Sequence, residues 1–260
     1  MDKNRIYGQN QKQECKIGAM WMKTQRIDKI LGNMGYGTRK EVKYMIKDGR
    51  IKVDGEVVKS SSIHVSPNEN TIEVDGEVLE YREYIYIMMN KPQGVVSATF
   101  DHKDETVIDL LEPMHQIFDP FPVGRLDKDT EGLLILTNDG KLSHELLSPK
   151  KHVPKTYFAC IDGVVNQKDI DSFEKGVILD DGYKTLPAKL NILKSDDTSE
   201  IELTIVEGKF HQVKRMFEAV GKKVTYLKRI SMGELYLDED LELGEYKELT
   251  EEELEKLKNR

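Results

Sequence analysis

Residues 124–140 read GRLDKDTEGLLILTNDG, and this stretch decides how the larger part of the chain is interpreted. Residues 133–136 form an uninterrupted apolar run, which is typical of a strand buried on both faces. The Asn-Asp-Gly at residues 138–140 predicts the turn after that strand. Asp127 is therefore expected on a polar loop at the mouth of a buried strand, a favourable position for a catalytic group. The plainer alternative is that Asp127 only caps a turn.

The sequence before this loop predicts how the same unit begins. Residues 84–89 are expected to form a strand that stops at Asn90-Lys91-Pro92-Gln93-Gly94, because proline fixes its own backbone angle and keeps the preceding residue extended. Further along, strands and helices alternate irregularly. The pattern indicates an α+β domain over residues 81–250, with an acidic C-terminal tail at residues 251–260.

A smaller unit is predicted over residues 22–80, after 21 residues that have no periodic apolar pattern and are expected to be disordered. Apolar residues at helical spacing after Ile27 predict one helix, and Thr38-Arg39-Lys40-Glu41 has the form of a capping box that opens a second. The second helix carries four basic residues away from its apolar stripe: Arg39, Lys40, Lys43 and Lys47. Turn signals then predict short strands at residues 50–53, 56–58 and 71–74.

The distribution of charge matters more than the formal net charge of −8. Residues 22–60 hold ten lysines and arginines against five acids, and residues 208–229 hold seven against one. Residues 234–260 hold eleven acids against four bases. Polyanion binding depends on the local field, so two basic islands are compatible with nucleic acid although the whole chain is acidic.

Several function classes find no support in the sequence. Cys15 and Cys160 stand in unrelated contexts, so neither a disulfide framework nor a metal site is predicted. No glycine-rich phosphate loop is present, and no apolar run reaches the roughly 20 residues of a membrane helix. We expect a cytoplasmic protein without a metal, a small-molecule cofactor or a membrane partner.

The N-terminal pattern resembles the S4-type RNA-binding domain. The matching residues are Arg26-x-Asp28-Lys29-x-Leu31, Thr38-Arg39-x-Glu41 and Ile46-x-x-Gly49-x-Ile51-x-Val53-Asp54-Gly55. The resemblance implies that Arg39, Lys40 and Lys43 contact RNA phosphates, which would position an RNA without reading its sequence.

The remainder resembles the pseudouridine synthases that modify ribosomal RNA. Gly-Arg-Leu-Asp-x-x-Thr-x-Gly-Leu at residues 124–133 is similar to their signature motif, whose aspartate, here Asp127, is essential. Lys155-Thr156-Tyr157 resembles the motif whose tyrosine stacks on the target base, and residues 207–216, EGKFHQVKRM, resemble the motif whose basic residue pairs with the aspartate. The resemblance implies catalytic roles for Asp127, Tyr157 and Lys214, and a mixed, mainly antiparallel sheet flanked by helices.

Helical geometry separates the two basic residues of the last motif. Val213, Met216 and Phe217 begin an apolar stripe with Lys214 at its edge, whereas Arg215 points away from it. Lys214 is therefore the better partner for Asp127, and Arg215 is assigned to RNA. The other RNA contacts predicted in this unit are Arg125, Asn90 and Lys91. An ordinary exposed position for Arg215 and plain strand packing for Tyr157 are the alternatives.

The His211-Gln212 form of the last motif looks like the RsuA type, which acts on small-subunit ribosomal RNA. The expected partner is this RNA or an assembling small subunit, and the chain is expected to be a monomer. A large-subunit pseudouridine synthase is the nearest alternative, followed by a catalytically silent ribosome-assembly factor. A glycoside hydrolase that pairs Asp127 with Asp129 or Glu131 fits the basic islands poorly.

Overall fold

The computed structural model describes residues 24–67 and 69–259 of the 260-residue chain. The predicted disorder of residues 1–21 lies outside these described residues. The chain divides into two compact units between Glu83 and Tyr84, a few residues beyond the predicted boundary at residue 80.

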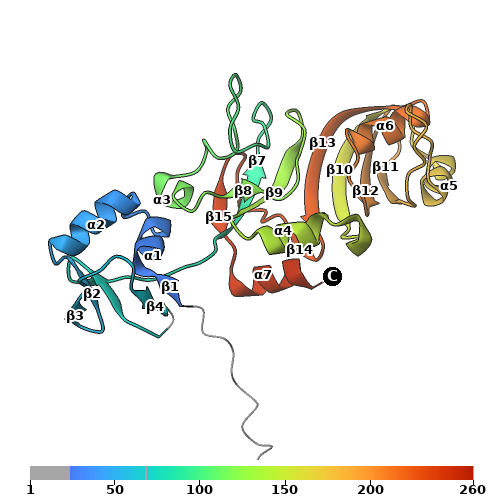
Figure 1. The fold of residues 1–260 in the computed structure, drawn as a ribbon. Helices are drawn as coiled ribbons and strands as arrows, with labels where there is room; N and C mark the ends of the chain where they lie inside the picture. Colours follow the sequence, from blue (N-terminus) through green and yellow to red (C-terminus); the bar gives the residue numbers. More distant parts are fainter. Residues whose placement is uncertain (1–23, 68, 260) are drawn as a thin grey trace, which may run out of the picture. The chain divides into compact units, whose positions relative to one another are not determined.

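The N-terminal unit combines two helices with short strands (Figure 1). Its elements are β1 (Gln25–Arg26), α1 (Ile27–Asn33), α2 (Arg39–Lys47), β2 (Ile51–Val53), β3 (Glu56–Val57), β4 (His64–Val65), β5 (Ile72–Val74) and β6 (Glu77–Val78). Strands β3, β2, β5 and β6 form an antiparallel sheet in that order, and β1 pairs with β4. The predicted helices and short strands are therefore confirmed, with ends that differ by a residue or two.

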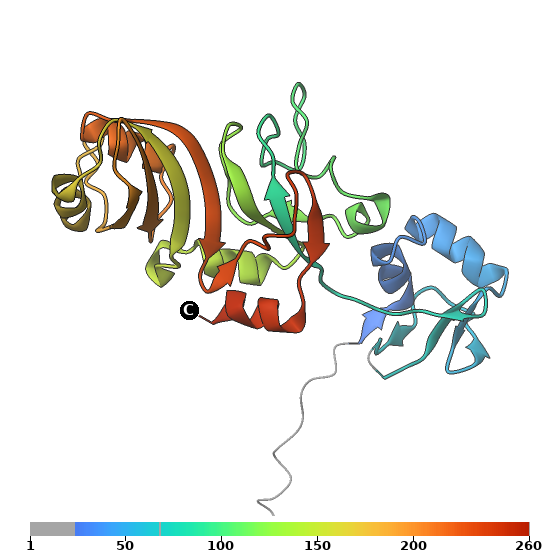
Figure 2. The ribbon, with the colours of Figure 1, turned by 180° about the vertical axis from the view of Figure 1, so that it is seen from behind.

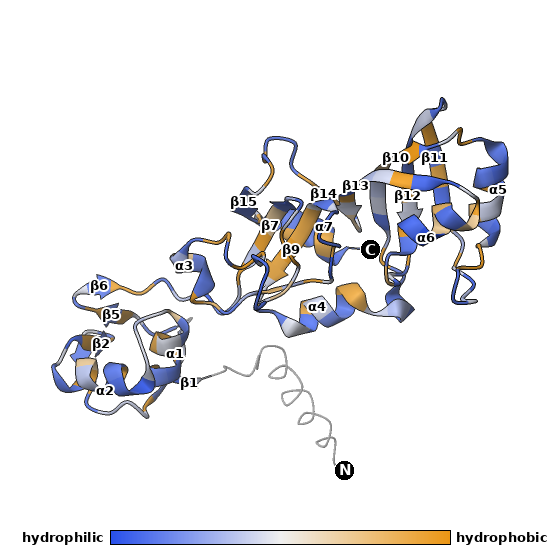
Figure 3. Ribbon diagram, turned by 90° about the horizontal axis from the view of Figure 1, so that it is seen from above, coloured by the Kyte–Doolittle hydropathy of each residue, from blue (hydrophilic) through white to orange (hydrophobic). Residues whose placement is uncertain are grey.

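Local chemistry explains how α2 begins and which face it buries. Thr38 accepts a hydrogen bond from the Glu41 backbone, and the Glu41 carboxylate accepts one from the Thr38 backbone at 2.6 Å, so the predicted capping box is present. The inward face of α2 packs with α1 and the sheet in one hydrophobic core. Figure 3 shows the helix as largely hydrophilic, and its basic residues Arg39, Lys40 and Lys43 are exposed.

The second unit is built on a nine-stranded sheet (Figures 1 and 2). Its strands are β7 (Tyr86–Lys91), β8 (Phe121–Pro122), β9 (Glu131–Thr137), β10 (Lys155–Asp162), β11 (Lys189–Lys194), β12 (Thr198–Ile205), β13 (Lys223–Met232), β14 (Leu235–Tyr236) and β15 (Tyr246–Glu248). The main order is β11-β12-β10-β13-β9-β7-β15, with β8 beside β9 and β14 beside β13. All seven residues of β9 are buried, as predicted for residues 133–136, and Figure 3 shows β7 and β9 as strongly hydrophobic.

A short parallel pairing joins two otherwise antiparallel halves of this sheet. Strand β13 meets β9 only where Lys228 lies beside Glu131 and Arg229 beside Gly132. A Cβ atom on Gly132 would lie 2.2 Å from the Arg229 carbonyl oxygen, so the close approach requires glycine at this position. We call this pairing the seam. It makes the sheet mixed but mainly antiparallel, which confirms the predicted class.

Helices pack on each half of the sheet. They are α3 (Pro113–Gln116), α4 (Gly140–Leu147), α5 (Gln167–Lys175), α6 (Gln212–Ala219), α7 (Glu251–Lys258) and the 3-10 helix η1 (Pro149–Lys151). The rings of Phe173 on α5 and Phe217 on α6 meet edge to face at 5.0 Å between their centroids. These helices support the half that carries β10 and β13.

The C-terminal segment differs from the predicted acidic tail. Residues 251–258 form α7, which Thr250 opens with a capping box. Leu257 is fully buried in the core beneath β9 and α4, with Leu254 packed against it. Because two apolar residues at helical spacing find a place in this core, the segment is part of the fold despite its acidic surface.

Within the residues that the structure describes, no helix is long and apolar enough to cross a membrane.

Candidate active site

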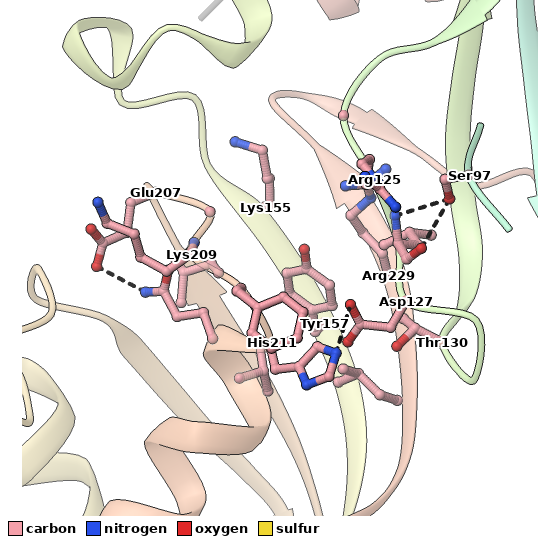
Figure 4. A pocket seen from close by; sticks show the side chains of 18 of the residues that line it. Ser97, Arg125, Asp127, Thr130, Lys155, Tyr157, Glu207, Lys209, His211 and Arg229 are labelled. Carbon is pink, nitrogen blue, oxygen red and sulfur yellow. Dashed lines mark hydrogen bonds and ion pairs between the residues drawn. The ribbon is translucent and has the colours of Figure 1, made fainter. Parts of the chain in front are cut away.

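A cavity of about 1200 Å³ opens in the second unit (Figure 4). Its walls come from the segments after β7 and before β9, from β10 and β13, and from the turn that leads into α6. Asp127 and Tyr157 line it, and Lys214 contacts the Asp127 carboxylate from α6. Thus three segments that lie far apart in the sequence supply the predicted catalytic residues at one place.

Asp127 lies on the loop that precedes β9, as predicted. The loop is held by its backbone, because Ser97 Oγ accepts a hydrogen bond from Leu126 N and donates one to Leu126 O. The amide of Gly94 donates to the Lys128 carbonyl at 2.8 Å. Among the described residues, no backbone N–H donates to the Asp127 carboxylate, so the carboxylate does not cap a turn. The rigid loop presents it to the cavity with 27% of its side chain exposed.

The predicted ion pair between Asp127 and Lys214 is present. Lys214 Nζ lies 3.1 Å from Asp127 Oδ2 and 2.6 Å from Asp129 Oδ1, with 19% of the lysine side chain exposed. Burial lowers the pKa of Lys214, but its hydrogen bonds to Asp129 and Asp127 outweigh burial, and the net pKa is raised. The hydrogen bond from Lys214 also lowers the pKa of Asp129. The lysine therefore stays charged between the two carboxylates and favours the ionised form of Asp129.

His211 is a further neighbour of Asp127, and its sequence motif gave it no role in the predicted site. Its Nε2 lies 3.6 Å from Asp127 Oδ1, and its backbone adopts a left-handed conformation at the start of α6. The ring stacks on Phe210 with 3.7 Å between centroids. The buried Gln212 beside it donates to Glu207 and accepts from the Lys209 amide, which fixes this turn.

Tyr157 lies in β10 with a buried side chain that lines the cavity. Figure 4 shows its ring beside His211 and Asp127. Lys155 lies two residues earlier on the same face of the strand and also lines the cavity. Burial, followed by the charge of Arg229, lowers the pKa of Lys155 to about 8. Strand alternation could have placed Lys155 beside Tyr157, but nothing in the sequence indicated its burial.

Asn90 and Lys91 do not occupy the position expected of RNA contacts. Both continue β7, where they pair with Leu133 and Gly132, and both side chains are buried. Lys91 Nζ donates to the carbonyls of Pro92, Asp127 and Thr130 at 2.9 to 3.2 Å. Burial lowers the pKa of Lys91 to about 8. Lys91 therefore supports the Asp127 loop from inside, where RNA has no access to it.

The remaining predicted RNA contacts differ in their surroundings. Arg125 is exposed at the cavity, and no hydrogen bond or ion pair joins it to another described residue. Arg215, in contrast, is only 13% exposed and pairs with Asp180 and, at 2.6 Å, with Asp181. The predicted exposure of Arg215 is therefore wrong, because two acids distant in the sequence fold onto it. Arg39, Lys40 and Lys43 are exposed in the N-terminal unit.

Within residues 24–67 and 69–259, no group of three or more histidine, cysteine, aspartate and glutamate side chains is arranged to hold a metal ion. The cavity instead offers a carboxylate paired with a lysine, an aromatic ring and buried cations. Such a set can act on an electrophilic carbon or remove a proton while a planar ring is held beside it.

Comparison with known proteins identifies the family. The family model of RNA pseudouridylate synthases matches residues 85–219, and that of the S4 domain matches residues 25–70. An uncharacterized RNA pseudouridine synthase of Bacillus subtilis is 56% identical over 88% of this chain and 96% of its own length. The ribosomal small subunit pseudouridine synthase A of Haemophilus influenzae is 41% identical over 89% of this chain and 99% of its own length. The ribosomal large subunit pseudouridine synthase B of Bacillus subtilis is 40% identical over 90% of this chain and 96% of its own length. The chain therefore belongs to the RNA pseudouridylate synthase family and carries an S4 domain ahead of its catalytic domain.

Proposed function

We propose that this enzyme converts a uridine of small-subunit ribosomal RNA to pseudouridine in the cytoplasm, with Asp127 as the catalytic carboxylate. The observation that carries the proposal is the Asp127–Lys214 ion pair in the wall of a cavity that Tyr157 also lines. The volume of about 1200 Å³ exceeds the roughly 300–1000 Å³ usual for small-molecule pockets. It leaves room for a flipped nucleotide together with part of its flanking chain.

The reaction breaks the C1′–N1 bond of uridine, turns the uracil and rejoins it to the sugar through C5. Asp127 either attacks C1′ or removes a proton from the sugar, and both roles require an ionised carboxylate. Lys214 supplies a cation 3.1 Å from this carboxylate. Tyr157 holds the extruded base by stacking, which replaces part of the stacking that the base loses in the RNA.

The S4 domain has a separate role in this proposal. Its exposed Arg39, Lys40 and Lys43 attract phosphates and raise affinity without selecting a base. Arg125, exposed at the cavity and without a protein partner among the described residues, contacts the RNA beside the target nucleotide.

The choice of the small subunit rests on the His211-Gln212 turn. His211 lies against Asp127, and the buried Gln212 fixes the backbone around it, so this dipeptide shapes the cavity beside the carboxylate. The near-equal identities of 41% and 40% to a small-subunit and a large-subunit enzyme favour neither target. The large-subunit reaction is therefore the second candidate.

Pseudouridine mapping tests the target directly. Ribosomal RNA of both subunits is compared between cells with the gene, cells without it, and cells that carry Asp127→Asn. One small-subunit site that is lost in the last two strains supports the proposal. Loss of a large-subunit site instead overturns the choice of subunit but not the reaction, and loss of no site overturns both.

A further inference from the structure

Arg229 is a buried cation in the cavity wall that the mechanism above does not use. The residue is 2% exposed in β13, and its Nε donates to the Leu133 carbonyl across the seam at 2.8 Å. Its Nη2 is buried without a hydrogen-bond partner among the described residues, and none of their carboxylates pairs with it. A single backbone contact therefore holds a guanidinium that has five N–H donors.

A buried charge without a counter-ion is costly, so its presence needs a reason. The other buried cation of this wall, Lys155, adds further positive charge, and its Nζ donates to the Val153 carbonyl. Two buried cations thus line a cavity in which the Asp127 carboxylate already pairs with Lys214. A ligand that brings acceptor oxygens or negative charge into the cavity would supply what Arg229 lacks.

The position of Arg229 indicates which part of an RNA would reach it. Arg229 lies directly opposite Tyr157 in the antiparallel pairing of β10 with β13, so the two side chains share one face of the sheet. Arg229, Tyr157 and Asp127 line the same cavity (Figure 4). A base stacked on Tyr157 would lie within reach of Arg229. Phosphates of the RNA backbone would instead meet the exposed Arg125.

We propose that Arg229 is a further catalytic residue, which donates a hydrogen bond to a carbonyl oxygen of the target uracil and stabilises the negative charge that develops on this base. When the C1′–N1 bond breaks, its electron pair stays with the uracil and spreads from N1 onto the carbonyl oxygens. The C1′–C5 bond then forms, the C5 proton leaves, and N1 takes up a proton. Arg229 transfers no proton in this sequence. It acts as a fixed donor in a desolvated site, where such donors are most effective.

The test compares saturated single-turnover rates of the full-length wild type, Arg229→Met and Arg229→Lys on the ribosomal RNA that the wild type modifies. The inference rests on the pseudouridine-forming reaction and not on the choice of subunit. Removal of one donor to a developing anion typically costs about 100-fold in rate. We expect that loss for Arg229→Met, with RNA affinity within a few-fold and partial recovery in Arg229→Lys. Lys222→Met is the control, since it removes a mostly buried cation that pairs with Asp169 outside the cavity.

A second measurement separates charge stabilisation from a structural role. The target uridine is replaced by 6-azauridine, whose ring nitrogen makes the base more acidic and so a better leaving group, while C5 keeps its hydrogen. Cleavage of the glycosidic bond should then depend less on Arg229. The factor by which Arg229→Met is slower than the wild type should therefore shrink at least several-fold. An equal deficit on both substrates would overturn the proposal, as would weaker RNA binding with a normal saturated rate. The latter outcome would assign Arg229 to phosphate binding. If the wild type formed no pseudouridine in either ribosomal RNA, the ribosomal substrate would be wrong, and the comparison would move to the RNA that it does modify.

Discussion

Replacing Lys214 by methionine tests whether this lysine supports the chemistry or only attracts RNA. The change removes the charge that lies 3.1 Å from Asp127 Oδ2 and keeps much of the aliphatic chain. At that distance Coulomb's law gives an attraction between the two charges of about 5 kcal/mol if the effective dielectric constant is about 20. In water the attraction falls to about 1 kcal/mol. Both side chains are mostly but not fully buried, so we expect removal of the lysine charge to cost about 3 kcal/mol. This cost corresponds to a rate that is roughly 100-fold lower.

Single-turnover kinetics at saturating enzyme measures this loss without interference from binding. Lys214→Met should lower the saturated rate by about 100-fold, and its RNA dissociation constant should change only a few-fold. Lys214→Arg should retain more activity, because it keeps the charge although the guanidinium geometry differs. Asp129→Asn is the matched control: it removes the other partner of Lys214, a 69% exposed carboxylate whose ion pair should contribute little.

A Lys214→Met enzyme with a normal saturated rate and a raised dissociation constant would show that Lys214 serves binding alone. Arg215→Met should not reproduce the Lys214 phenotype, since Arg215 pairs with Asp180 and Asp181 rather than with Asp127.

Three further outcomes are expected. Asp127→Asn should abolish pseudouridine formation and leave the melting temperature nearly unchanged, because the carboxylate lies on a loop; more than a few per cent of wild-type turnover contradicts this. Neutralising Arg39, Lys40 and Lys43 together should reduce the slope of log affinity against log salt by about two to three units; an unchanged slope excludes phosphate contacts. Burial lowers the pKa of Lys91 from 10.5 to about 8, so the unfolded chain binds more protons between these values, and this contribution makes the unfolding free energy rise with pH there. Denaturant titrations at pH 8 and 10 should show a smaller rise in Lys91→Met than in the wild type.

Much of the site was predictable because its signals are local. The apolar run at residues 133–136 indicates a buried strand wherever it occurs, and the residues before it then form a loop. The spacing of Val213, Met216 and Phe217 fixes one face of α6, and all three are buried. That face determines which neighbouring basic residue turns towards Asp127, so helical periodicity alone could distinguish Lys214 from Arg215.

The errors share a different cause, since each depends on contacts between segments distant in the sequence. Lys91 is buried because carbonyls of the Asp127 loop, 36 and 39 residues later, accept its hydrogen bonds. Arg215 is shielded by two aspartates some 35 residues earlier in the chain. The acidic C-terminal segment becomes a packed helix because the core has space for Leu257. In each case the local composition predicted an exposed side chain or segment, and tertiary contacts buried it instead.

The seam between β9 and β13 has a consequence for the order of events during synthesis. Asp127 and Lys214 are 87 residues apart, and they meet only when the two halves of the sheet have joined. The edge strand β15, which pairs with β7, leaves the ribosome later still. The S4 domain, in contrast, is complete by Glu83 and can fold while the rest of the chain is still being made. A nascent chain therefore acquires its RNA-binding domain long before it has a working catalytic centre, and chemistry begins only after both halves of the sheet have been made.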